Sequence, residues 1–152
     1  MAIRASREIV IEAPPGEILA ALADIDSIPV WSAVHKRAEV IDRYDDGRPH
    51  HVRVAVRVLG LIDEEILEYH WGPNWLVWDA ERTTQQYAQH VEYTLKPDPM
   101  TNATTVRVDI TVEPAAPLPH FLVKRASKAV LESATRGLRE RVLAGKAAVQ
   151  RK

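Results

Sequence analysis

The clearest pattern in the sequence is an alternation of valines with other residues between positions 51 and 59. The valines occupy every second position, at Val52, Val54, Val56 and Val58. A period of two predicts a strand with one buried face. Segments of the same kind recur along the chain, separated by turns rich in Gly, Pro, Asn and Asp. The predicted strands cover residues 3–12, 34–44, 51–59, 62–71, 75–81, 85–95 and 104–113. Their short connections predict one antiparallel sheet.

Two helical regions interrupt this pattern. Pro14 and Pro15 end the first strand, because proline cannot donate to a sheet but fits the first turn of a helix. Apolar residues then follow at helical spacing over residues 18–25, and a second short turn is expected at 26–29. Residues 121–143 predict a long amphipathic helix. The predicted order is therefore one strand, two short helices, six strands and a long helix.

The long helix has an unusual inner face. An antiparallel sheet with an apolar face must be covered, and only this helix is long enough to cover it. The centre of its inner face nevertheless carries small residues, namely Ala126, Ala129, Ser133 and Gly137. They fit either direct packing of the helix on the sheet or a gap available to a ligand. The pattern alone leaves both interpretations open.

Several segments resemble the START/polyketide cyclase-dehydrase superfamily. They are residues 11–18, 23–32, 76–78, 93–97 and 118–122. The resemblance extends over nearly the whole chain in the same order. It implies an α+β helix-grip fold, in which a seven-stranded curved antiparallel sheet wraps around a long C-terminal helix. Two short helices between strands 1 and 2 would then close one end of the sheet. We expect a single domain at residues 1–146 and a frayed tail at 147–152.

The resemblance also implies a class of function. That superfamily includes lipid and sterol carriers, ubiquinone-binding proteins, hormone receptors and aromatase/cyclases, all of which use the same cavity. We therefore expect binding or carriage of a hydrophobic small molecule such as a lipid, polyketide or isoprenoid-like compound. A polyketide cyclase or dehydratase with a Tyr or His proton donor is the alternative, and a macromolecule-binding module is a further one. Fold alone does not decide among them.

Strand phase provides the candidate cavity residues. The valine face is taken as inward, and tyrosines together with Gln89 are the polar groups expected to orient an apolar ligand. The predicted ligand-binding residues are Val54, Val56, Leu67, Tyr69, Trp78, Tyr87, Gln89, Tyr93, Leu122, Ala126, Ala129, Val130, Ser133 and Gly137. An error of one residue in register would invert any of the strand sets.

No catalytic residue can be assigned from the sequence. The absence of cysteine excludes disulfides and thiolate chemistry. The six histidines show no metal-binding spacing on a predicted helix, and no phosphate-cradling glycine loop or nucleophile elbow is present. We therefore expect surface histidines, no metal and no cofactor. Asp63, Glu64, Glu65 and Glu68 crowd one strand. We expect most of them to be solvated rather than paired for acid–base work.

Charge and hydropathy narrow the expected partners and location. A formal net charge of −1 gives no reason to expect nucleic-acid binding, and the basic face of the long helix is expected to face solvent. No run has the length of a membrane span or the form of a signal peptide, so we expect a cytoplasmic protein without stable membrane insertion. The oligomeric state stays open.

Overall fold

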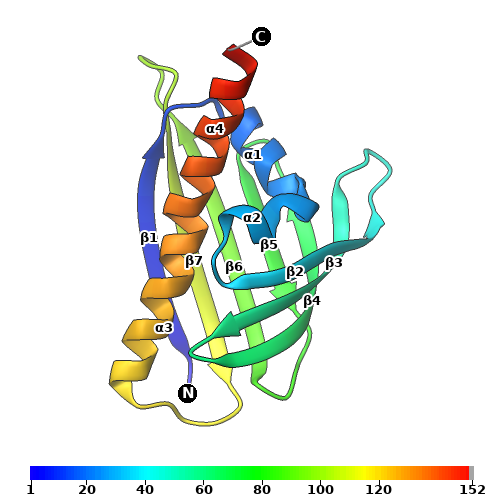
Figure 1. The fold of residues 1–152 in the computed structure, drawn as a ribbon, viewed down its shortest axis with the longest axis vertical. Helices are drawn as coiled ribbons and strands as arrows, with labels where there is room; N and C mark the ends of the chain where they lie inside the picture. The colour runs from blue at the N-terminus through cyan, green and yellow to red at the C-terminus, as the bar shows by residue number, and fades with distance from the viewer. Residues whose placement is uncertain (151–152) are drawn as a thin grey trace.

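A seven-stranded antiparallel sheet forms the body of the molecule in this computed structural model (Figure 1). Its strands are β1 (Ile3–Ile11), β2 (His35–Arg43), β3 (Pro49–Val58), β4 (Leu61–Trp71), β5 (Trp75–Ala80), β6 (Gln86–Pro97) and β7 (Thr104–Pro114). Their order in the sheet is β1-β7-β6-β5-β4-β3-β2. The meander from β2 to β7 follows from the short turns that join these strands, and β1 pairs with β7 at its end.

The long C-terminal helix crosses the concave face of the sheet (Figure 1). It consists of α3 (His120–Glu132), a π-helical turn η2 (Ser133–Gly137) and α4 (Leu138–Gln150). The structure describes the backbone of residues 1–150 and the side chains of residues 1–146. The tail expected at 147–152 therefore lies outside the fully described part. The α+β helix-grip architecture predicted from the sequence is confirmed.

Three short helical segments connect β1 to β2. They are α1 (Pro15–Ala23), a 3₁₀ turn η1 (Ile25–Ser27) and α2 (Ile28–Trp31). Pro14 is extended at the start of α1 and Pro15 occupies its first turn, as proline geometry favours. Ile18 and Leu22 are buried on the inner face of α1. The predicted pair of short helices is therefore present, and α1 packs beside α4 at one end of the sheet (Figure 1).

The inward phase of the valine strand is correct. Val52 and Val54 are buried in the core, and Val56 and Val58 are partly buried on the same face. The phase predicted for β6 is wrong at its start, because an irregularity lies between Gln86 and Ala88. A β-bulge of this kind shifts the alternation of faces by one residue.

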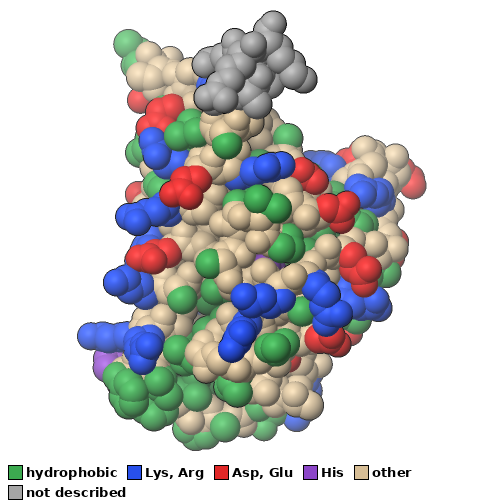
Figure 2. All heavy atoms as spheres, in the orientation of Figure 1, with side chains coloured by type: hydrophobic (Ala, Val, Ile, Leu, Met, Phe, Trp, Pro, Cys, Tyr) green, Lys and Arg blue, Asp and Glu red, His purple; other side chains and the backbone are tan. Residues whose placement is uncertain are grey.

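The inner face of the long helix also differs in part from the prediction. Leu131, Ser133 and Thr135 are buried, whereas Ala129 is exposed. Ala129 precedes the π turn and lies on the outer side of α3, next to the exposed Lys128. The π turn shifts the helical phase only from Ser133 onward. The basic residues Lys124, Arg125, Lys128 and Arg136 are exposed, and Figure 2 shows basic side chains along this side of the molecule.

Candidate functional site

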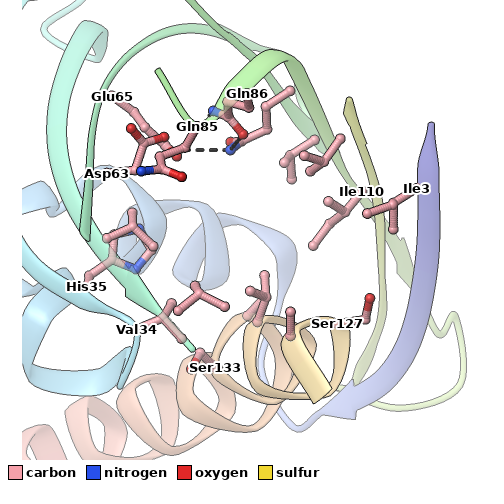
Figure 3. Close-up of a pocket in the computed structure, with 18 of the residues that line it drawn as sticks. Ile3, Val34, His35, Asp63, Glu65, Gln85, Gln86, Ile110, Ser127 and Ser133 are labelled. Atoms are coloured by element: carbon pink, nitrogen blue, oxygen red, sulfur yellow. Dashed lines mark hydrogen bonds between the residues drawn. The ribbon is translucent and has the colours of Figure 1, made fainter. Parts of the chain in front are cut away.

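A cavity of about 360 Å³ lies between the concave face of the sheet and the long helix. Its wall is formed by side chains from the strands, from the connection between β1 and β2, and from α3 and η2. In Figure 3, Ile3 and Ile110 line one side, Ser127 and Ser133 lie on the helix side, and Glu65 and Gln86 lie across from the helix. The helix therefore does not fill the space above the sheet, and the interpretation of a gap between them is correct.

The cavity opens at the end of the molecule opposite α1. The exposed residues in its wall are Leu59, Leu61, Thr84, Gln85 and Ala116. They belong to the turn between β3 and β4 with its flanking residues, the β5–β6 connection and the β7–α3 connection. All of these lie at the lower end of Figure 1. Since α1 packs at the other end, a ligand would enter between these three connections.

Most of the residues predicted for a ligand site meet in this cavity. Those in its wall are Val56, Leu67, Tyr69, Trp78, Gln89, Tyr93, Ala126, Val130 and Ser133. Their common location follows from correct strand phases in β3, β4 and β5 and from small residues on the helix. Whether they bind a ligand stays a prediction.

Five predicted residues lie outside the cavity wall: Val54, Tyr87, Leu122, Ala129 and Gly137. Val54 is buried in the core, and Ala129 is exposed. Leu122 is partly buried in the first turn of α3. Tyr87 is 46% exposed, because the bulge in β6 turns Gln86 inward in its place. Gly137 faces the backbone of Trp31, which occupies the space that a side chain would need.

Aromatic side chains form the deeper part of the wall. The rings of Tyr69 and Trp78 stack with centroids 5.0 Å apart, and the ring of Tyr93 lies 5.8 Å from that of Trp78. The Tyr93 hydroxyl donates to the carbonyl oxygen of Ala134 at 3.0 Å. Burial raises the pKa of both tyrosines well above the usual range. Tyr93 is therefore a neutral, hydrogen-bonded part of the wall.

An acidic cluster forms the polar part of the wall. Glu65 is only 5% exposed and accepts hydrogen bonds from the side-chain amides of Gln86 at 3.1 Å and Gln89 at 3.3 Å. Asp63, two residues earlier on the same face of β4, accepts from the Thr83 hydroxyl at 2.9 Å. The pKa of Glu65 is raised to about 8, mainly because the carboxyl group is buried and in addition because of the hydrogen bond and the charge of the neighbouring Asp63.

The expectation that most acidic residues of this strand are solvated holds for Glu64 and Glu68, which are exposed, but is wrong for Glu65. The sequence did contain a signal for the inward position of Glu65. Asp63 and Glu65 have the same parity as Leu67 and Tyr69, which were placed inward. Gln86 was missed because only the bulge brings it inward.

His35 also belongs to the cavity wall, where surface histidines were expected. Val56 pairs with His35 on one side and with Asp63 on the other, so the three residues form one row across the sheet. The Nδ1 atom of His35 lies 2.6 Å from the Ser32 hydroxyl oxygen. Removal from water lowers the pKa of His35 to about 4, so its imidazole is neutral at physiological pH.

A second histidine cluster lies outside the cavity. His51 contacts Asp42 through Nδ1 at 2.9 Å and Glu68 through Nε2 at 3.2 Å, and the tilted ring of His50 lies 4.0 Å from that of His51. The potential ligand atoms of Asp42, His50 and His51 lie within 4.8 Å of one another. The hydrogen bond that the His51 ring donates to the Asp42 carboxylate raises the pKa of His51. These contacts form a network of surface ion pairs and share no residue with the cavity wall.

The fold and the cavity beneath the long helix define a helix-grip protein with a largely apolar pocket. Residues 2–148 match the model of the family described as polyketide cyclase / dehydrase and lipid transport, and the chain belongs to this family. A comparison with curated proteins finds no match.

Several solved structures share the fold. A START superfamily protein from Mycobacterium smegmatis is 23% identical, with 93% of this chain and 97% of that chain covered and a TM-score of 0.82. A protein from Thermus thermophilus is 22% identical, with 95% and 99% covered and a TM-score of 0.76. The Zhui aromatase/cyclase from a Streptomyces species is 13% identical, with 93% and 94% covered and a TM-score of 0.76. At these identities the likeness concerns the fold alone.

Among the described residues, no helix has both the length and the hydropathy needed to cross a membrane.

Proposed function

We propose that the protein binds and carries a hydrophobic small molecule in the cavity beneath the long helix. The observation that carries this proposal is an apolar cavity of about 360 Å³ with few polar groups, which is within the size range of small-molecule sites. Family membership supports it, because the family description includes lipid transport. The aromatic part of the wall, with Tyr69 and Trp78 stacked, would contact an apolar ligand.

The binding proposal can be tested with a neutral fluorescent probe. N-phenyl-1-naphthylamine carries no charge and becomes bright in apolar sites, so a titration reports occupancy of the cavity. Native mass spectrometry of the gently purified protein would detect a ligand that remains bound. Saturable probe binding with one site per chain supports the proposal. Absence of any saturable binding, together with an unliganded mass, would contradict it.

A polyketide cyclase or dehydratase is the second candidate, and Glu65 is the observation that favours it. A carboxyl group whose pKa is raised to about 8 can exchange a proton near neutral pH. The structure favours Glu65 for this role over the tyrosines, because the Tyr93 hydroxyl is bonded to Ala134 and Tyr87 lies outside the cavity. This candidate predicts turnover of a polyketide substrate that the Glu65→Gln variant loses although it still binds the probe. Unchanged turnover in that variant would remove Glu65 from the mechanism.

A further inference from the structure

The polar part of the cavity wall is acidic, and among the described residues no Lys or Arg side chain lies beside it. Figure 3 shows Asp63, Glu65, Gln85 and Gln86 gathered on one wall, with Glu65 joined to Gln86 by a hydrogen bond. No Lys or Arg is among the described residues that line the cavity. His35 also lines the cavity in the described part of the chain, and its imidazole is neutral at physiological pH.

Glu64, the residue before Glu65 on β4, lies in a different environment. Glu64 points to the outer face, is exposed and forms an ion pair with Arg37, with 2.7 Å between Nη2 and Oε1. Glu65 points inward, where two side-chain amides contact its carboxyl group. A cation that enters the cavity would therefore find carboxyl oxygens without a competing basic side chain.

We infer that the cavity selects apolar ligands whose head group donates a hydrogen bond and carries no negative charge, and that it rejects fatty-acid anions. This inference rests on the proposed function. An incoming carboxylate would lose its water beside Asp63 and Glu65 without gaining a cationic partner, and burial of an unpaired charge is strongly unfavourable. Two neighbouring carboxylates also repel each other. An amine or an alcohol instead donates to the oxygens of these acids.

The position of the acids also orients the ligand. Glu65 lies on β4 between the exposed Leu61 at the mouth and the buried Tyr69 further along the strand. Tyr69 lies further along β4 from Leu61 than Glu65 does, and Trp78 pairs with Tyr69, so these aromatic side chains lie further from the mouth. The head group would lie near the mouth, beside Asp63 and Glu65, and the apolar tail would extend to the stacked rings of Tyr69 and Trp78.

Three probes of equal chain length test this selectivity: dodecylamine, dodecanol and dodecanoate. Each is titrated below its aggregation concentration against the protein loaded with N-phenyl-1-naphthylamine at pH 9, where Glu65, whose pKa is raised to about 8, is ionised and an alkylamine still carries its positive charge. We expect the amine and the alcohol to displace the probe at least about tenfold more tightly than dodecanoate. In Glu65→Gln the amine should weaken about fivefold and dodecanoate should strengthen, whereas Glu64→Gln on the outer face should match the wild type.

The outcomes separate the two proposals. Equal or tighter binding of dodecanoate by the wild type overturns the selectivity and leaves hydrophobic binding standing. Failure of all three ligands and of the probe to bind overturns the proposed function, and the selectivity with it. Since the comparison of the three ligands uses the wild type, it does not depend on the folding of a variant. Asp63→Asn provides a second variant on the same wall, for which the same loss of preference is expected.

Discussion

The backbone of Trp31, at the end of α2, packs directly against Gly137 in the π turn of the long helix. A Cβ atom added to Gly137 would lie less than 3.0 Å from the Trp31 carbonyl oxygen, a separation that unbonded atoms do not tolerate. This contact ties the short helices that close one end of the sheet to the helix that covers it. Glycine is therefore required here by close approach rather than by an unusual backbone angle.

Gly137→Ala should destabilise the protein, although helix propensity alone would favour alanine by up to about 1 kcal/mol. Because the obstacle is a backbone oxygen, the two segments must move apart, and overpacking of this kind costs about 1–3 kcal/mol. Gly145→Ala is the matched control in the same helix, since nothing lies within 4 Å of its added Cβ. Urea unfolding measures both variants. A gain of stability in Gly137→Ala similar to that of the control would contradict the contact.

Tyr93→Phe should lower stability by about 1 kcal/mol, because it removes the hydrogen bond to the Ala134 carbonyl and leaves that oxygen without its partner. Tyr87→Phe changes an exposed hydroxyl outside the cavity and should have no measurable effect. Equilibrium unfolding in urea distinguishes the two. Equal stability of both variants would show that the Tyr93 bond contributes nothing to the fold.

Glu65→Gln should change how stability depends on pH. The folded pKa of Glu65, about 8, lies above its ordinary value of 4.5. A raised pKa contributes stability that is fully present below the ordinary value and is lost as pH rises through the folded value. The wild type should therefore lose up to about 1.4 kcal/mol per pH unit relative to Glu65→Gln between these limits. Urea unfolding at pH 5 and pH 8 measures the difference.

The control for this measurement is Glu64→Gln, which removes an exposed acid from the same strand. Its stability difference from the wild type should not follow the trend of Glu65→Gln. A difference between the wild type and Glu65→Gln that stays constant from pH 5 to pH 8 would mean that Glu65 titrates as an ordinary surface carboxyl group.

The fold was predictable because its signals are local and repeated. Alternating valines in β3, the two prolines before α1 and the long amphipathic helix each determine an element, and their order leaves few arrangements. The cavity wall was predictable only where alternation continues unbroken, as it does from Leu67 to Tyr69. Because of the bulge in β6, Gln86 faces the cavity in the position predicted for Tyr87. The bulge depends on the pairing of β6 with β7, which the sequence of a single strand does not reveal.

The acidic wall was missed for a different reason. Charged residues are usually exposed, and this general tendency predicts a solvated Glu65, whereas its parity places Glu65 on the same face as Leu67 and Tyr69. The burial of Glu65 depends on amide donors from β6, a strand that is separated from β4 in the sequence by the whole of β5. Such a partner becomes visible only when the strands are brought together in the sheet. A buried acid with no Lys or Arg beside it among the described residues is also the observation on which the proposed head-group preference rests.

Ser133→Leu should fill part of the cavity and weaken binding of N-phenyl-1-naphthylamine at least about tenfold. Ser133 is buried and lines the cavity from the helix side, so the larger side chain has empty space to enter (Figure 3). Stability should change little, whereas direct packing of the helix on the sheet would make the same substitution cost about 1–3 kcal/mol. Ala129→Leu adds a leucine at an exposed position on the same helix and should leave binding unchanged. Clear destabilisation of Ser133→Leu with intact probe binding would mean that the space beside Ser133 does not receive the ligand.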